Sequence, residues 1–342
     1  MANAIEKVNG IAIGDIEKVN GITDANLQAL NGLEFTAAVT YTVAKGVGGN
    51  TETDGTADGN YKYHIFTSSG TFEITTLGTD SDVQFLVLAG GGGAGVGGGG
   101  AGGYRSSVGT EASGGGASVE SRITGQVSTY TITVGAGGSA ASGGSGNTTS
   151  KGGNGVASSI GSPASISTVG GAGGAGKTSN AGAVEHATVG GSGGGGGRDG
   201  NGNSSAGTAN QGYAGGDGQS AGWGGAGGGG GAGQVGEDGD GNGVNSGELP
   251  GNGGNGVSSS ITGSAVTRGG GGGGGSEGVN SYGAGGTGGG GRGASNSDGG
   301  DAVAGTTNTG GGAGGRSHHS FPGGATNKAG GSGLVILRYL YQ

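Results

Sequence analysis

The feature that most constrains this chain is where its glycines lie. Glycine accounts for 105 of the 342 residues, and only 11 of these precede Gly90. The remainder form runs such as 90–93, 97–100, 193–197, 227–231 and 269–275, separated by short polar stretches. Such runs have almost no side chains with which to build a core. Any ordered structure in this region must therefore come from backbone packed against backbone.

Composition leaves few regular structures for such a region. Collagen requires glycine at every third position and abundant proline, whereas this chain has 3 prolines and no strict period. Disorder is the usual consequence of Gly/Ser-rich composition. The ordered option is a set of polyproline-II-type helices made of glycine, which have three residues per turn and no internal hydrogen bonds. Because each N–H and C=O then needs a partner on a neighbouring helix, we predict that the central helices are nearly pure glycine.

An 11-residue repeat occupies the first 36 residues. Its copies begin at Ile5, Ile16 and Leu27, and each carries Asn-Gly between apolar residues. Asn-Gly favours a tight turn because both residues tolerate positive φ. Three short copies cannot bury a core of their own. We therefore predict that residues 1–36 form an attachment segment that docks on a partner or on another copy.

Two groups of predicted strands flank the glycine region. Several segments within residues 37–88 alternate apolar and polar side chains, with Val39, Tyr41 and Val43 as the first example, which predicts half-buried strands. Residues 51–60 between them are predicted to form a polar loop. Residues 83–89 are almost continuously apolar, as in the centre of a sheet. The closing segment 334–341 is similarly apolar. We predict a small β-sheet collar, 37–88 closed by 334–341, from which residues 89–333 project as one excursion.

Within 89–333 we expect about ten glycine-rich passes that stack as a polyglycine-II sandwich, or slab. The fold class is thus mainly β and irregular. Polar segments join the passes, and loops on a rigid scaffold commonly carry function. Aromatic, Arg and His side chains in or near these segments are the candidate receptor-binding residues: Tyr213, Trp223, Tyr282, Arg316, His318, His319 and Phe321. Aromatic and Arg side chains dominate binding hot spots. An alternative role for some of them is to cap the faces of the slab.

One segment has the spacing of a calcium loop. Asp238, Asp240 and Asn242 alternate with glycines, as in the first half of an EF-hand loop, but Leu249 stands where the twelfth-position glutamate is expected. A Ca²⁺ site competes here with a solvated turn, and we expect no other cofactor. No motif for a catalytic nucleophile is present, so we predict that the chain is not an enzyme.

Charge and hydropathy bear on the partners. The formal net charge is −9 and Lys plus Arg number only 14, which disfavours nucleic acid and anionic membranes as partners. Cysteine is absent. There is no N-terminal apolar segment typical of a secretory signal and no apolar run long enough to insert into a membrane.

The glycine runs and polar connecting segments of 89–333 resemble the tip adhesins of long tail fibres in T-even-like bacteriophages. That family stacks polyglycine-II helices and presents variable loops for host recognition. The segments Phe85-Leu-Val-Leu-Ala-Gly-Gly-Gly and Gly333-Leu-Val-Ile-Leu-Arg-Tyr resemble a broader glycine-rich family of phage structural proteins. The start, Ala2-Asn-Ala-Ile-Glu-Lys-Val-Asn-Gly-Ile, resembles virion proteins of marine phages and cyanophages.

The resemblance implies a phage virion fibre or appendage protein, made in the host cytoplasm and extracellular after release. Residues 1–36 would contact other virion proteins, and the connecting loops would bind a host-surface protein or glycan. A homo-oligomer is expected, with a trimer as one form. The alternatives are a self-assembling structural filament that binds no receptor, and an ice-binding protein, although sustained rows of Thr or Ala are not present.

Overall fold

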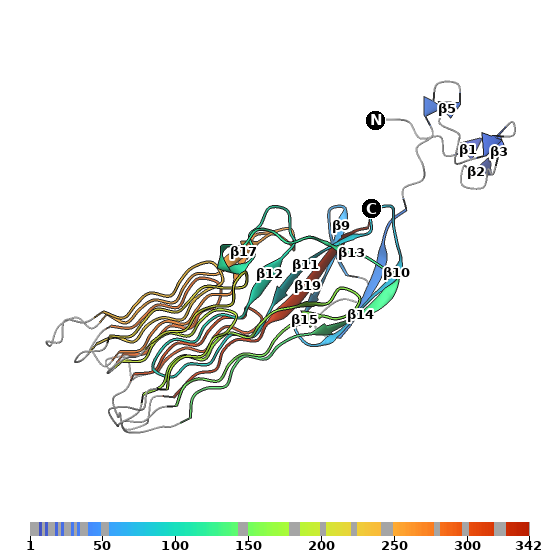
Figure 1. Cartoon of the computed structure of the whole chain (residues 1–342). Coiled ribbons are helices and arrows are strands. Elements are labelled where there is room, and N and C mark those ends of the chain that lie inside the picture. Colours follow the sequence, from blue (N-terminus) through green and yellow to red (C-terminus); the bar gives the residue numbers. More distant parts are fainter. Residues whose placement is uncertain are drawn as a thin grey trace.

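The computed structural model describes residues 40–48, 55–142, 150–177, 185–198, 203–219, 224–240, 249–276, 281–295, 301–317 and 326–341, and the backbone of six short strands before residue 35. Figure 1 shows two β-sheets, with long glycine-rich passes projecting from one end of them. Within the described part of the chain, no helix is long and apolar enough to cross a membrane.

The sheets form a two-layer sandwich. The first has the order β16-β15-β14-β10-β7, and the second β12-β11-β19-β9-β8, with β13 also paired to β11. The first sheet comprises β7 (Val43–Gly48), β10 (Gly70–Thr76), β14 (Ser128–Thr133), β15 (Ser159–Ile160) and β16 (Ile166–Ser167). The second comprises β8 (Thr56–Asp58), β9 (Tyr61–Phe66), β11 (Asp82–Leu88), β12 (Tyr104–Ser106), β13 (Ile123–Thr124) and β19 (Leu334–Leu340).

The central strands pair as the sequence predicts. β11 and β19 are antiparallel, with Phe85 opposite Leu337 and Val87 opposite Val335. These side chains pack on Phe72 and other residues of the facing sheet in one buried cluster. Alternate residues of β11 and β19 point to the other face of their sheet and are also buried. Burial on both faces explains why both strands are almost continuously apolar.

A group of loops, here called the cover, closes the side of the second sheet that points away from the first sheet. It consists of the hairpin of β17 (Val257–Ser259) and β18 (Val266–Arg268) and the loop around the 3₁₀ turn η3 (Gly114–Gly116). Glu111 from that loop accepts hydrogen bonds from the backbone N–H and hydroxyl of Ser260. The hydroxyl of Tyr104 is buried beneath this cover. Burial and the nearby Glu111 carboxylate raise the pKa of Tyr104 well above its usual value.

The glycine region shows the three-fold hydrogen bonding expected of polyglycine II. Along the pass 97–103, the backbone N–H groups of three successive residues donate to three different passes: Gly98 to Gly227, Gly99 to Ala313 and Gly100 to Ala172. The pattern repeats after three residues: Ala101 donates to Gly230, which lies in the same pass as Gly227, the acceptor for Gly98. A three-residue helical turn is the simplest backbone geometry that produces this repeat.

The passes pack as a bundle around 97–103, which exchanges hydrogen bonds with six others. These six inner passes are 89–95, 169–177, 190–198, 224–232, 269–276 and 310–317. Each inner pass also bonds to its two inner neighbours, so they form a closed ring. Among the described residues, eleven outer passes surround this ring: 135–142, 150–157, 185–190, 203–207, 212–219, 235–240, 249–256, 281–287, 289–295, 301–306 and 326–333.

Close approach of the backbones explains why the centre is glycine. A Cβ added to Gly98 would overlap the carbonyl oxygen of Gly272, and one added to Gly99 would overlap that of Gly92. Neither residue is among those with positive φ. Glycine is therefore required here by the distance between chains and not by its conformational freedom.

The architecture differs from the predicted slab in two respects. The passes are more numerous than ten, and they surround a central pass in place of lying in flat layers. The span 89–333 is also not one excursion, since β12 to β18 lie within it and return to the sandwich. The short alternating segment that forms β14 adds to the first sheet beside β10. Single-sequence patterning identifies such strands but not the layer that they join.

Near the N-terminus, the backbone forms three two-stranded hairpins. They are β1 (Lys7–Val8) with β2 (Ile11–Ala12), β3 (Lys18–Val19) with β4 (Ile22–Thr23), and β5 (Ala29–Leu30) with β6 (Leu33–Glu34). In each hairpin two residues, Asn-Gly, separate the paired positions, as the repeat predicts. Docking of this segment on a partner stays a prediction.

Candidate functional site

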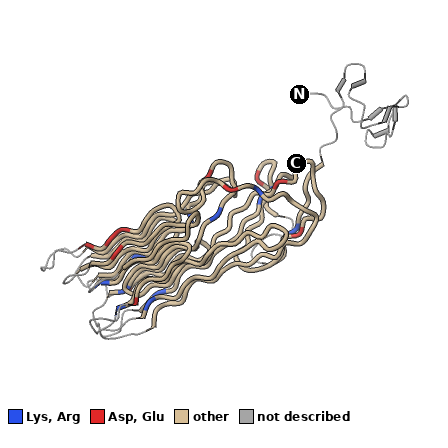
Figure 2. The backbone as a smooth tube through the Cα atoms, in the orientation of Figure 1, with Lys and Arg blue, Asp and Glu red and all other residues tan. Residues whose placement is uncertain are grey.

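The charged residues of the bundle are concentrated at the end remote from the sheets, here called the remote end. The described passes carry six basic and six acidic residues, and each lies within four positions of a segment outside the described residues. Figure 2 shows the middle of the bundle almost without charge. The twelve charged residues of the described passes are Lys151, Lys177, Arg198, Arg292, Arg316, Lys328, Glu185, Asp217, Glu237, Asp238, Asp240 and Asp301. Side-chain chemistry is thus placed at one end of a chemically uniform scaffold.

Two of these cations lie inside the bundle. Arg198 and Arg316 end inner passes and are each only 3% exposed. The backbone N–H of Arg316 donates to Gly95, next to the buried turn at Val96 that joins the central pass to 89–95. Burial lowers the pKa of Arg316. The sequence-predicted receptor residue Arg316 is therefore buried within the remote end, and its role in binding stays a prediction.

An exposed aromatic side chain lies at the rim of the remote end. Tyr282 is 47% exposed, and the guanidinium of Arg292 lies 4.8 Å from the centre of its ring. Leu249, on the adjacent outer pass, is 58% exposed. An aromatic ring held by a cation on one side and open to solvent on the other is a suitable contact for a ligand.

The other predicted receptor residues are distributed differently. Tyr213 lies at the opposite end of the bundle, beside the cover of the second sheet. Its hydroxyl is so close to Gly116 of the cover that a Cβ added to Gly116 would contact it. The structure therefore does not bring Tyr213 together with Tyr282 and Arg316. Trp223, His318, His319 and Phe321 lie outside the described residues. Their role in binding stays a prediction.

The proposed calcium residues belong to an outer pass. The carboxylate of Asp238 accepts a hydrogen bond from the backbone N–H of Asp217, 2.7 Å away. Asp240 exchanges backbone hydrogen bonds with Leu249, and Asn242 lies outside the described residues. Among the described residues, no group of three or more acidic or His side chains could hold a metal ion. The calcium site stays a prediction.

Polar side chains on outer passes have a role that the sequence analysis missed. Asn154 accepts hydrogen bonds from the N–H of Gly173 and the hydroxyl of Thr188, and Glu185 accepts one from the N–H of Lys151. These side chains bridge the passes 150–157 and 185–190, and no backbone hydrogen bond between described residues joins these two passes directly. The three-residue spacing of 151 and 154, and of 185 and 188, is the detectable sequence pattern.

Polar side chains also join outer passes on the far side of the bundle, and the outer passes with these bridging side chains are here called the outer wall. The side-chain amide of Asn252 donates to Glu237, and its oxygen accepts from the N–H of Ala284. Asn255, three residues on, repeats this arrangement with Gln234 and Thr287. The side-chain oxygens of Asn252 and Asn255 thus accept from outer-pass N–H groups, in addition to the backbone hydrogen bonds that join the same passes.

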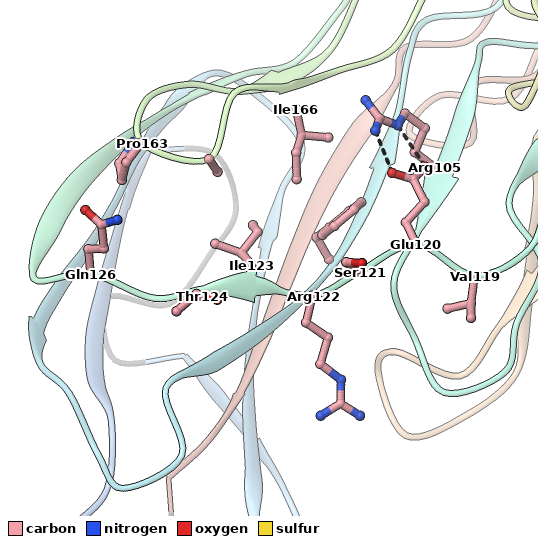
Figure 3. A pocket seen from close by; sticks show the side chains of 12 residues that line it. Arg105, Val119, Glu120, Ser121, Arg122, Ile123, Thr124, Gln126, Pro163 and Ile166 are labelled. Carbon is pink, nitrogen blue, oxygen red and sulfur yellow. Dashed lines mark hydrogen bonds and ion pairs between the residues drawn. The ribbon is translucent and has the colours of Figure 1, made fainter.

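A hollow of about 600 Å³ lies beside the sandwich, away from the bundle. Figure 3 shows Arg105 and Glu120 joined at its edge. Apolar residues such as Ile123 and Ile166 and polar residues such as Thr124 and Gln126 line the remainder. Glu120 raises the pKa of Arg105 by hydrogen bonding to its guanidinium. These two charges therefore satisfy each other at the edge of the hollow.

Comparison with known proteins identifies the class to which the chain belongs. A family model described as a glycine-rich domain matches residues 67–340, so the chain belongs to that glycine-rich domain family. This span covers the entire bundle and the strands of the sandwich from β10 onward, and it leaves out β7, β8 and β9. The comparison with curated proteins gave no match.

Proposed function

We propose that this chain is a bacteriophage fibre or appendage protein whose remote end binds a receptor on the host surface. The observation that carries the proposal is the concentration of charge and of the exposed Tyr282 at that end. The scaffold beneath is held by backbone hydrogen bonds, so connecting segments can change in sequence without disturbing a side-chain core. Adhesion requires no catalytic group.

Residues 1–36 take the complementary role in this proposal. Two-residue strands give each hairpin little apolar contact area, and an isolated two-stranded hairpin is marginally stable. Contact with other virion proteins would supply the missing burial. The chain would then be attached at its N-terminal part and would present the remote end of the bundle to the host cell.

The test is binding of the labelled full chain to a panel of intact bacterial cells. We expect saturable binding that is lost when residues 220–223 are replaced by Gly and Ser, and weakened by Tyr282→Ser. Tyr213→Ser is the matched control, because it removes the same side chain at the opposite end of the bundle. Thermal melting of each variant verifies that the scaffold is intact.

The outcomes separate the alternatives. Equal binding by all variants, or loss of binding only in Tyr213→Ser, would contradict a receptor site at the remote end. Long filaments in the absence of saturable binding would support the structural filament without a receptor.

A further inference from the structure

Strand β7 directs its larger apolar side chains away from the core of the sandwich. Val43 and Val47 point outward and are 49% and 60% exposed, whereas Ala44 and Gly46 face the core. Tyr41, just before the strand, is also exposed at 39%. A solitary sandwich normally turns the larger apolar residues of an edge strand inward. The orientation of β7 therefore indicates that its outer side is covered by something else.

The outer side of the first sheet, here called the outer face, continues this surface across β10 and β14. Val47 lies opposite Thr71, which lies opposite Thr131 on the next strand. The outward residues of β10 and β14 are otherwise threonines with a single glutamate, Glu73. β-branched side chains form a flat surface that packs well against a second sheet.

The outer-face positions of β7, β10 and β14 include two charges, and they lie directly opposite each other. Lys45 of β7 is the register partner of Glu73 of β10. Both are exposed, and no ion pair or hydrogen bond of either side chain is present among the described residues. The face thus carries one positive and one negative group side by side, both available to an external partner.

We propose that the outer face is where two copies of this chain pack sheet on sheet about a two-fold axis. A two-fold axis between Lys45 and Glu73 places each lysine against Glu73 of the partner subunit, so the pattern is self-complementary. The valines and threonines around this pair supply the apolar contact. Because β7 is the first strand of the sandwich, the N-terminal parts of the two chains would join their sheets at the same interface. This inference does not depend on receptor binding.

The proposal is tested with charge reversals in the full chain. Lys45→Glu leaves two acidic groups on each face, and Glu73→Lys leaves two basic groups. By sedimentation analysis we expect wild-type dimers and at least a tenfold weaker dimerisation of each variant alone. An equimolar mixture of the two variants restores dimers, because opposite charges then meet across the axis. This restoration distinguishes contacts between subunits from the pair within one chain.

Val303→Glu is the control, since Val303 is similarly exposed but lies on the bundle, and we expect it to dimerise like the wild type. Thermal melting confirms that each variant is folded. A monomeric wild type, a trimer, unaltered dimerisation of both charge variants, or failure of the mixture to restore dimers would each overturn the proposal. If the wild type is instead a monomer whose outer face is protected from hydrogen exchange, the N-terminal segment of the same chain occupies that face.

Discussion

The sandwich and the glycine bundle bury their interiors by opposite means. In the sandwich, Phe66, Phe85 and Tyr130 fill the space between two sheets, and the gain comes from apolar area removed from water. In the bundle, the central pass buries seven residues of which six are glycine, and its interior is held by backbone hydrogen bonds. The passes leave and re-enter the sheets repeatedly, so the two regions share one chain but not one physical basis for stability.

The difference changes which substitutions each region tolerates. A side-chain core fails when a large residue becomes small, because a cavity remains. A backbone core fails when the smallest residue becomes larger, because neighbouring chains are separated and lose their hydrogen bonds. Substitutions that enlarge a buried residue should therefore disrupt the bundle, and substitutions that shrink one should disrupt the sandwich.

We expect the largest effect from Gly99→Val. The new side chain would overlap the carbonyl oxygen of Gly92 and disturb the hydrogen bonds that join Gly99 to Ala313 and Gly272. Since no flexible side chain is available to move aside, the loss should exceed about 3 kcal/mol and prevent assembly of the bundle. Rapid cleavage of the glycine region by proteinase K is the expected readout. Ala304→Val, an exposed outer-pass change, should stay resistant; equal resistance of both variants would contradict a backbone core.

Phe85→Ala is the converse change in the sandwich. Phe85 is fully buried between the sheets, and truncation should cost about 3–5 kcal/mol. Because both chain ends of the bundle enter β11 and β19, we expect the amides of the bundle to lose hydrogen-exchange protection together with those of the sheets. Val303→Ala, on an exposed position, should change the free energy of unfolding by less than about 0.5 kcal/mol. Bundle amides that stay protected in Phe85→Ala would show that the bundle folds independently.

The sequence predicts the two regions to different extents. The pairing of β11 with β19 follows from their continuous apolar character, and the glycine centre follows from hydrogen-bond accounting. The ring of passes does not follow, because glycines carry no side-chain pattern that specifies neighbours. At the candidate site, the exposure of Tyr282 and the burial of Arg316 depend on which pass is outer and which inner. The role of Asn154 likewise becomes evident only from its neighbours.

A smaller effect depends on pH and tests the cover of the second sheet. Burial raises the pKa of Tyr104 above its unfolded value of about 10. The folded protein therefore holds this proton at a pH where the unfolded chain has released it, so stability is complete below pH 10 and falls as the pH rises above it. The slope approaches about 1.4 kcal/mol per pH unit. Thermal melting between pH 8 and about 11 measures it, and Tyr104→Phe should flatten this part of the curve; an unchanged slope would contradict the assignment.

The smallest effect concerns the outer wall, where the bundle uses side chains in place of backbone. Asn154→Ala removes the acceptor for the N–H of Gly173, which is buried beneath it, and for the hydroxyl of Thr188. We expect a loss of about 1 kcal/mol, with faster exchange confined to the Gly173 amide and its neighbours. Asn154→Asp keeps the accepting oxygen and should retain protection. If both variants exchange alike, the outer passes are held by the inner ring alone, and the backbone core extends to the surface of the bundle.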